Sequence, residues 1–270
     1  MKKLNKISEY NNIHPKKTIF IIGNGPQLGD LTPSQILQLE KSTTIGTNAS
    51  YLSIESPYYI AGHISVMLLT CHFVSKPANR IFHGEPQHHP FPTEWNVTSI
   101  ANINIVGPPG HFPKPIDLGG PLVGAENVGL SATHLAHIMG ASRIVYIGFD
   151  FKSNSHFYDT NLITYNKLKS DVEEILNIYS YDNFIHNDII DYYNARNFKE
   201  SLTDERIAQL SNQPFLSSST PVYNSMLEKF SSAFTTFKQQ NIEIISTQED
   251  SIITEAGGKF IPLDIILKNK

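Results

Sequence analysis

Cysteine and long apolar runs are nearly or wholly missing from this chain. Cys71 is the only cysteine, so no disulfide can form within the chain, which fits a reducing compartment such as the cytoplasm. No apolar run reaches about 18 residues, so we expect no membrane-spanning helix. The stretch 1–17 is polar and basic without an apolar centre, so we expect a loose tail there and not a secretory signal.

Charged residues are also scarce. They make up 17% of the 270 residues, with 21 basic and 25 acidic side chains and a net charge of −4. This balance gives no electrostatic footprint for bulk nucleic-acid binding, although it leaves a local basic groove open. The hydrophobic content of 40% is typical of a globular protein, and the length of 270 residues is enough for one large domain or two small ones.

What the chain does contain is a strand-like run that ends in a glycine-rich turn. The apolar stretch 19–22 continues into Gly-Asn-Gly-Pro at 23–26. Such a run is typical of a buried parallel strand followed by a tight turn. Because Gly23 and Gly25 have no Cβ atom, a ligand phosphate could approach the backbone N–H groups there. An ordinary strand-to-helix turn is the alternative, since Gly-x-Gly alone is a weak fingerprint.

Strand and helix patterns alternate along the rest of the chain. We expect strands at 19–22, 43–46, 58–61, 80–83, 103–106, 143–151 and 242–246. We expect helices at 33–41, 65–74, 128–139, 168–179, 203–210 and 221–240. This alternation predicts an α/β fold with a doubly wound, mostly parallel Rossmann-like sheet and a helical lid.

The chain divides into four expected parts. They are a tail at 1–17, a nucleotide-binding core at 18–151 with a long loop at 84–124, a helical lid at 152–220, and a helix and strand at 221–270 that complete the core. The long loop carries His88, His89 and His111. No cysteine or closely spaced carboxylate completes a ligand set with these histidines, so a surface or acceptor-side loop is favoured over a metal site.

Four stretches of the chain together resemble one family. They are Ile22 to Pro26, Ile45 to Asn48, Gly140 to Asp150 and Ile242 to Ser251. In combination they resemble the bacterial sialyltransferases built on a single Rossmann-like domain. They are also similar to a related superfamily of glycosyltransferase-like proteins, which includes flagellin-modifying motility accessory factors and archaeal hydroxymethylpterin diphosphokinases. The resemblance implies that a nucleotide-activated donor is held at the strand ends.

The resemblance also implies where the donor binds. It places the Gly-Asn-Gly loop at the donor phosphate and Asn48 at the nucleotide. The candidate donor-binding residues are Gly23, Asn24, Gly25, Pro26, Asn48, His63, Asn127, Gly129 and Asp150. Asp150 stands at the expected carboxyl end of a strand, where ligands sit in open parallel sheets. We expect a nucleotide-sugar substrate and no tightly bound cofactor, and a divalent metal is left open.

The chain departs from the sialyltransferase pattern at three places. Gln27 stands where those enzymes usually have serine, and Asn127-Val128 stands where they have Thr-Ser. The stretch 217–220, which corresponds to the place of their catalytic histidine, contains none. The donor sugar is therefore not assigned by the resemblance.

Histidines near the lid are the candidate catalytic groups. Transfer to a hydroxyl needs a base, and histidine titrates near neutral pH. His156 follows Asp150 by six residues and is the first candidate, with His186 and His63 as alternatives. Tyr158 is a candidate partner of the leaving phosphate, with packing inside the lid as its alternative role.

Three functions stay open at this point. The first is a glycosyltransferase that moves a sugar from a CMP- or UDP-sugar to a glycan, protein, small molecule or modified nucleic-acid base. The second is an ATP-dependent pterin-type diphosphokinase, which should need Mg²⁺ and paired carboxylates, and only Asp150 and Asp159 are suitably placed. The third is a non-catalytic nucleotide- or glycan-binding module. The sequence has no Asp-x-Asp motif, which disfavours a metal-dependent transferase of that type. Whether the chain forms a homo-oligomer is left open.

Overall fold

A parallel sheet forms the centre of the molecule. The computed structural model describes residues 7–76, 78–83, 97–100, 102–103, 122–123, 127–151, 156–212 and 221–268. Eight of the described strands form one sheet in the order β10-β9-β8-β1-β2-β3-β4-β5, and every neighbouring pair is parallel. They are β1 Thr18–Ile22, β2 Thr43–Thr47, β3 Tyr58–Ala61, β4 Asn79–His83, β5 Val97–Ile100, β8 Arg143–Ile147, β9 Glu243–Ser246 and β10 Lys259–Phe260.

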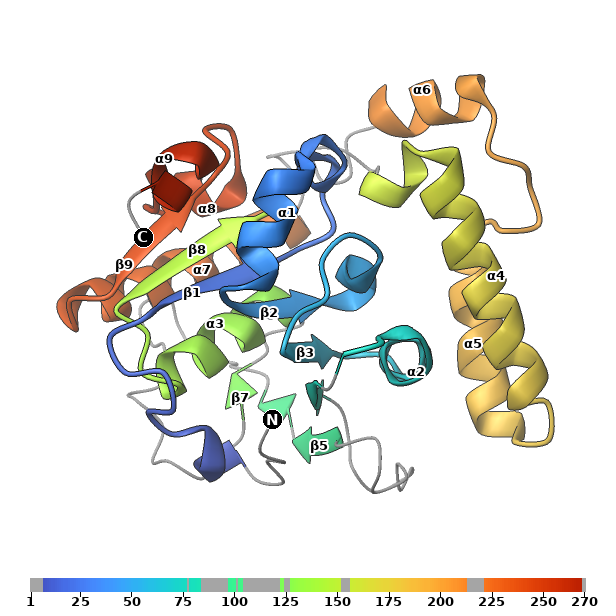
Figure 1. Ribbon diagram of the computed structural model, residues 1–270, viewed down its shortest axis with the longest axis horizontal. Coiled ribbons are helices and arrows are strands. Elements are labelled where there is room, and N and C mark those ends of the chain that lie inside the picture. The colour runs from blue at the N-terminus through green and yellow to red at the C-terminus, as the bar shows by residue number, and fades with distance from the viewer. Residues whose placement is uncertain are drawn as a thin grey trace.

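Helices cover both faces of this sheet (Figure 1), which confirms the predicted doubly wound α/β fold. The α-helices are α1 Pro33–Glu40, α2 Ile64–Phe73, α3 Val128–Ile138, α4 Leu162–Ile178, α5 Asn183–Ala195, α6 Asp204–Asn212, α7 Pro221–Gln239, α8 Ile252–Glu255 and α9 Leu263–Lys268. Short 3-10 turns are η1 Ile7–Tyr10, η2 Pro26–Asp30, η3 Asn48–Leu52 and η5 Phe157–Asp159. None of the helices in the described ranges is long and apolar enough to cross a membrane.

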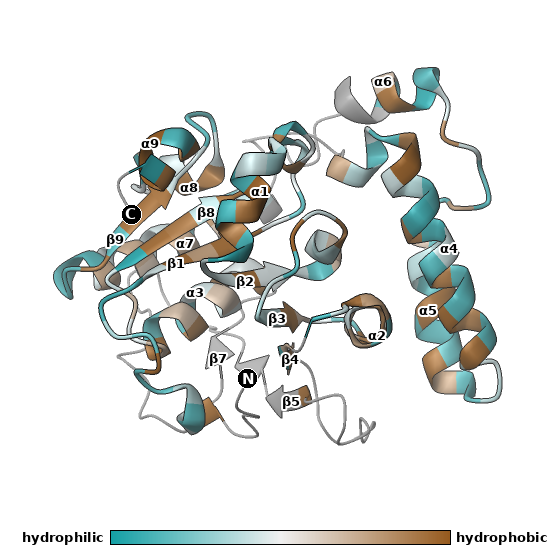
Figure 2. Ribbon diagram, viewed as in Figure 1, coloured by the Kyte–Doolittle hydropathy of each residue, from teal (hydrophilic) through white to brown (hydrophobic). Residues whose placement is uncertain are grey.

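Alternate side chains of β1 belong to two separate hydrophobic cores. Phe20 and Ile22 pack on the face covered by α1, α2, α4 and α9. Ile19 and Ile21 pack on the opposite face, against α3, α7 and α8. All four side chains are fully buried, and the central strands are accordingly brown in Figure 2. A central parallel strand buried on both faces is continuously apolar, which is why this strand was predictable.

Residues 7–17, the described part of the segment expected to be a loose tail, contact the core. Ile7 and Tyr10 of η1 are buried in the core that contains α3. Three backbone N–H groups donate to carbonyls at the end of α3 at 2.8 Å, from Asn12 to Ile138, from His14 to Met139 and from Lys16 to Gly140. These contacts could not be predicted from the polar composition of the segment, because backbone groups form the hydrogen bonds.

The lid, defined here as residues 156–212, contains η5, α4, α5 and α6. Helix α4 begins at Leu162, earlier than predicted, because the Asn161 side chain accepts bonds from the next turn of backbone. Helix α5 was not predicted, and Asp182 caps its start in the same way. The two helices lie side by side next to α2 (Figure 1), and Asp188 of α5 accepts a 2.7 Å bond from the Ser65 N–H at the start of α2.

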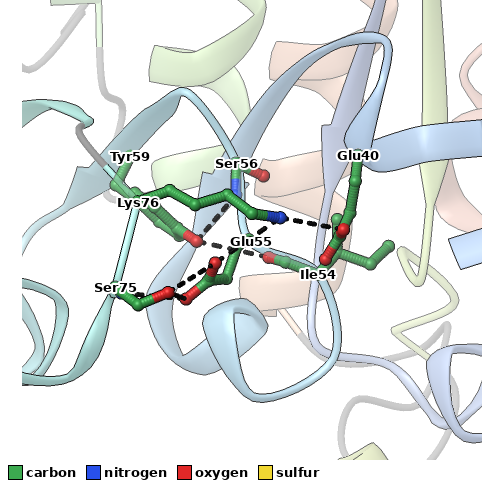
Figure 3. Close-up of polar contacts among 7 residues, drawn as sticks. All are labelled: Glu40, Ile54, Glu55, Ser56, Tyr59, Ser75 and Lys76. Atoms are coloured by element: carbon green, nitrogen blue, oxygen red, sulfur yellow. Dashed lines mark hydrogen bonds and ion pairs between the residues drawn. The ribbon is translucent and has the colours of Figure 1, made fainter. Parts of the chain in front are cut away.

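A polar network connects the segments that lie before the amino ends of β3 and β4 (Figure 3). Lys76 Nζ lies 2.8 Å from Glu40 Oε2 and 3.5 Å from Glu55 Oε2. Glu55 also accepts bonds from the backbone and hydroxyl of Ser75 at 2.9 and 2.8 Å. These contacts tie the end of α1 to the loops that precede β3 and β4.

The predicted long loop at 84–124 is described only in part. The strand expected at 103–106 overlaps the short β6 (Asn102–Ile103), which pairs with β7 (Leu122–Val123) outside the main sheet. His88, His89 and His111 lie outside the described residues. Strand β5, at the edge of the main sheet, was not predicted.

Candidate functional site

The carboxyl ends of β1 and β8 border a pocket. These strands are parallel neighbours, and the chain continues from β1 to β2 on one side and from β8 to β9 on the other. Where strand order diverges in this way, the loops separate and leave a crevice. The crevice here is a pocket of about 360 Å³. That volume is in the usual range for small-molecule sites.

Eight of the predicted site residues line the pocket, namely Gly23, Asn24, Gly25, Asn48, His63, Asn127, Asp150 and His156. The predicted residues outside the lining are Pro26, Gly129, Tyr158 and His186. The lining also includes Thr47, Val128, Gly148, Phe149, Phe151 and Arg196, which were not predicted.

The glycines after β1 serve the packing of the two strand ends. The Gly23 and Gly25 N–H groups donate to the carbonyls of Ile147 and Gly148 at 2.8 and 2.9 Å. A Cβ on Gly23 would lie 2.2 Å from the Gly148 carbonyl oxygen, and one on Gly25 would lie 2.5 Å from Asp150 Oδ1. Both amides are thus already bonded, and Gly25 has an ordinary φ of −64°. The expected contact of these amides with a phosphate is not what requires the glycines.

Asn24, between the two glycines, lines the pocket and has a buried side-chain oxygen. Its side-chain Nδ2 donates to the Thr47 carbonyl at 3.0 Å, and its backbone carbonyl accepts from the Phe157 N–H of the lid at 3.0 Å. Its Oδ1 is buried and has no partner among the described residues. A buried acceptor left without a donor is costly unless a ligand or water supplies one.

Three lining residues have left-handed backbone conformations. Asn48, Gly148 and Phe151 have φ values of 50°, 71° and 55°. Asparagine and glycine adopt this region readily, whereas a phenylalanine there is strained. Such outliers cluster at ligand sites, where the surrounding structure holds them. Asn48 immediately follows β2, at the place that the sequence predicted.

The amino terminus of α3 faces the same pocket. Asn127 caps this helix, and its Oδ1 accepts from Gly129 N–H at 2.7 Å. The ring of Phe149 fills the space next to both Gly23 and Gly129, so it joins the helix start to the loop after β1. The dipole of this helix gives its start a partial positive charge that favours anions.

His156 and Asp159 form a hydrogen-bonded pair at the start of the lid. His156 Nδ1 lies 3.2 Å from Asp159 Oδ2, which also accepts from the His156 backbone N–H at 2.9 Å. Because the carboxylate is an acceptor, we assign the proton of the neutral ring to Nδ1. The Nε2 lone pair is then the basic site of a residue that lines the pocket.

The lid surrounds the His156 ring with aromatic and cationic groups. The Tyr158 ring stacks on it, with centroids 4.9 Å apart and planes 10° apart. Arg196 Nη1 lies 3.1 Å from Nδ1 and 3.4 Å from Nε2. An atom nearly equidistant from both ring nitrogens at this range lies over the ring face. Burial first, and then the charge of Arg196, lower the pKa of His156, and the opposing effect of Asp159 does not outweigh them.

We expect the His156 imidazole to titrate below its ordinary pKa of 6.5. Since the unfolded chain then binds this proton at a higher pH than the folded protein, stability falls as the pH drops below 6.5, until the folded pKa is reached. An NMR pH titration measures this pKa, and the imidazole resonance that disappears in His156→Gln is the one that belongs to His156. A titration midpoint of that resonance at or above pH 6.5 would contradict the expectation. Between about pH 7 and about pH 5, wild type should also lose unfolding free energy relative to His156→Gln.

The other two candidate bases differ in position. His63 is exposed and precedes α2, and it lines the pocket. His186 is half-buried on α5 and does not line it, and its Nδ1 has no partner among the described residues. Tyr158 is buried behind His156, which favours the packing role that the sequence left open.

Arg196 is the lining residue that sequence reasoning missed most clearly. It is the C-cap of α5, and α5 itself was not predicted. Within the described residues, no three His, Cys, Asp or Glu side chains are placed to share a metal ion. The chain matches no family model, and comparison with curated proteins and with solved structures found no match.

Proposed function

We propose that the protein is a glycosyltransferase that moves a sugar from a nucleotide-activated donor, a CMP- or UDP-sugar, to an acceptor hydroxyl. The observation that carries this proposal is the His156–Asp159 pair, which opens onto the pocket at the ends of β1 and β8. His156 is the general base that removes the proton from the acceptor hydroxyl. Asp159 holds the ring in the tautomer with a free Nε2, as the orienting carboxylate does in hydrolase triads.

The surroundings of this pair fit a phosphate-bearing donor. The start of α3 contributes a partial positive charge, which stabilises a leaving phosphate. The Asp150 carboxylate, which lines the pocket, is an acceptor suited to hydroxyl groups of a ribose or sugar. His156 is neutral at pH 7 because its pKa is lowered, so it can accept a proton.

The diphosphokinase alternative is less well supported by this geometry. It calls for two carboxylates near the phosphates. Asp150 lines the pocket, but Asp159 is occupied by two bonds from His156 and is not a lining residue. The non-catalytic alternative would leave His156 without a function in turnover, which a variant can test.

A thermal-shift panel of CMP, UDP, GDP, ATP and sugar nucleotides tests the donor class. We expect CMP or UDP compounds to raise the melting temperature most. A ligand at about 100 times its Kd adds about 2.7 kcal/mol of stability. The pocket variant Asn24→Ala should lose the shift, whereas Asn166→Ala, on the exposed side of α4, should keep it. A larger shift with ATP would favour the kinase, and no shift with any compound would contradict the proposal.

A further inference from the structure

Arg196 brings a charge into the pocket from the lid. It ends α5 and is the only described residue of α4, α5 or α6, or their caps, that lines the pocket. Its guanidinium lies over the rings of Tyr158 and Tyr192, with distances of 5.6 and 5.5 Å to their centroids, and against His156. These contacts orient the side chain without neutralising it.

No described carboxylate lies within ion-pair distance of Arg196, although the Asp159 carboxylate acts on its charge from further away. The ion pairs found among the described residues do not include Arg196. Arg143, by contrast, lies 2.7 Å from Glu243, and Arg206 lies 3.3 Å from Glu200. The nearest carboxylate, Asp159, is bonded to His156 and compensates the half-buried guanidinium only in part, so an anion bound in the pocket would stabilise Arg196 further.

The other charged groups facing the pocket limit where an anion can bind. Asp150 is the only carboxylate among the described lining residues, and it packs against Gly25. His63 lies at the start of α2, and His156 carries the Arg196 guanidinium over its ring. A phosphate is therefore repelled at Asp150 and attracted at Arg196, whose planar fork of donors matches phosphate oxygens.

We propose that Arg196 is the phosphate-binding residue of the pocket and that it couples donor binding to the base. This inference rests on the proposed function and specifies the group of the donor that the lid recognises. Arg196 contacts both the bound phosphate and the His156 ring. When the phosphate compensates its charge, the Arg196 effect on His156 weakens and the Nε2 lone pair becomes more basic. The base thus strengthens when a donor is present.

Calorimetry with a nucleotide, its nucleoside and inorganic pyrophosphate tests this assignment. The nucleotide is CMP or UDP, whichever gives the larger thermal shift. Arg196→Met keeps an unbranched apolar stem and removes the charge, and we expect nucleotide and pyrophosphate affinity to fall about 10- to 100-fold. Nucleoside affinity should stay unchanged. Arg196→Lys should lose less, because it keeps the charge without the fork.

The matched control is Arg143→Met, at the opposite end of β8 from the pocket. This variant should bind the nucleotide and pyrophosphate like wild type. Its partner Glu243 keeps the ion pair with Lys259. If wild type binds the nucleotide and Arg196→Met binds it equally well, this inference fails and the proposed function stands. An equal loss of nucleoside and nucleotide affinity also overturns it, since the residue would then support the whole pocket. If wild type binds no phosphate compound, both proposals fail. In Arg196→Met without ligand, the pKa of His156 measured by NMR should rise.

Discussion

His156→Ala should lower kcat by about 10²–10⁴-fold, the usual effect of removing a general base. Donor affinity should change little, because the base addresses the acceptor and not the nucleotide. The measurement is nucleotide release from the CMP- or UDP-sugar under saturating donor, with the acceptor or with water. In wild type, the acidic limb of kcat/KM should lie below pH 6.5, since a lowered pKa keeps the ring neutral there, and this limb should vanish in the variant.

Two further histidine variants make the result specific. His72→Ala, on α2 where the ring bonds to the Tyr179 hydroxyl, is the control that should keep full turnover. His186→Ala tests the alternative base that lies outside the pocket lining. If His186→Ala loses turnover while His156→Ala keeps it, the site stands but the base is misassigned. Full turnover in both variants would move the base to His63, the remaining candidate histidine that lines the pocket.

Gly23→Ala should destabilise the fold by about 3 kcal/mol or more. A Cβ there would lie 2.2 Å from the Gly148 carbonyl oxygen and 2.8 Å from the Phe149 ring. The carbonyl belongs to the backbone directly after β8 and accepts a bond from the Gly25 N–H, so it cannot move aside without breaking that bond. Overpacking at the upper end of its usual range is therefore expected. Urea unfolding, monitored by circular dichroism, measures the loss.

Gly29→Ala is the matched control for this substitution. Gly29 belongs to the same connection, and its Cβ would meet no atom closer than 3.8 Å. We expect its unfolding free energy to stay within about 1 kcal/mol of wild type. If Gly23→Ala is as stable as Gly29→Ala but binds no nucleotide, the glycine serves the ligand and not the packing of β1 on β8.

The sequence contained enough to locate the pocket. β1 and β8 are buried on both faces, so each is a continuous apolar run that needs no tertiary context to be recognised. Parallel strands end at the same edge, and this brought the residues after Ile22 next to Asp150. That geometry explains why eight predicted residues line one pocket.

What the sequence could not supply were contacts between distant segments. Helix α5 has only one fully buried apolar residue, Ile189, and is held by the Asp182 cap and by packing on α2. Because that helix was not predicted, the position of Arg196 at its end could not be predicted either. The packing role of Gly23 was not predicted for a related reason. A missing Cβ is visible in the sequence, but the neighbour that needs the space belongs to β8.

The pairing of β1 with β8 has a consequence for how this protein folds. Thr18 pairs with Arg143, so residues that are 125 positions apart in the sequence must meet before the centre of the sheet forms. Contacts of such long range slow folding, because closing the loop has an entropic cost before any contact forms. During synthesis, one edge of β1 stays unpaired until β8 has emerged from the ribosome. The pocket lies between the ends of these two strands, so it forms only after this late step.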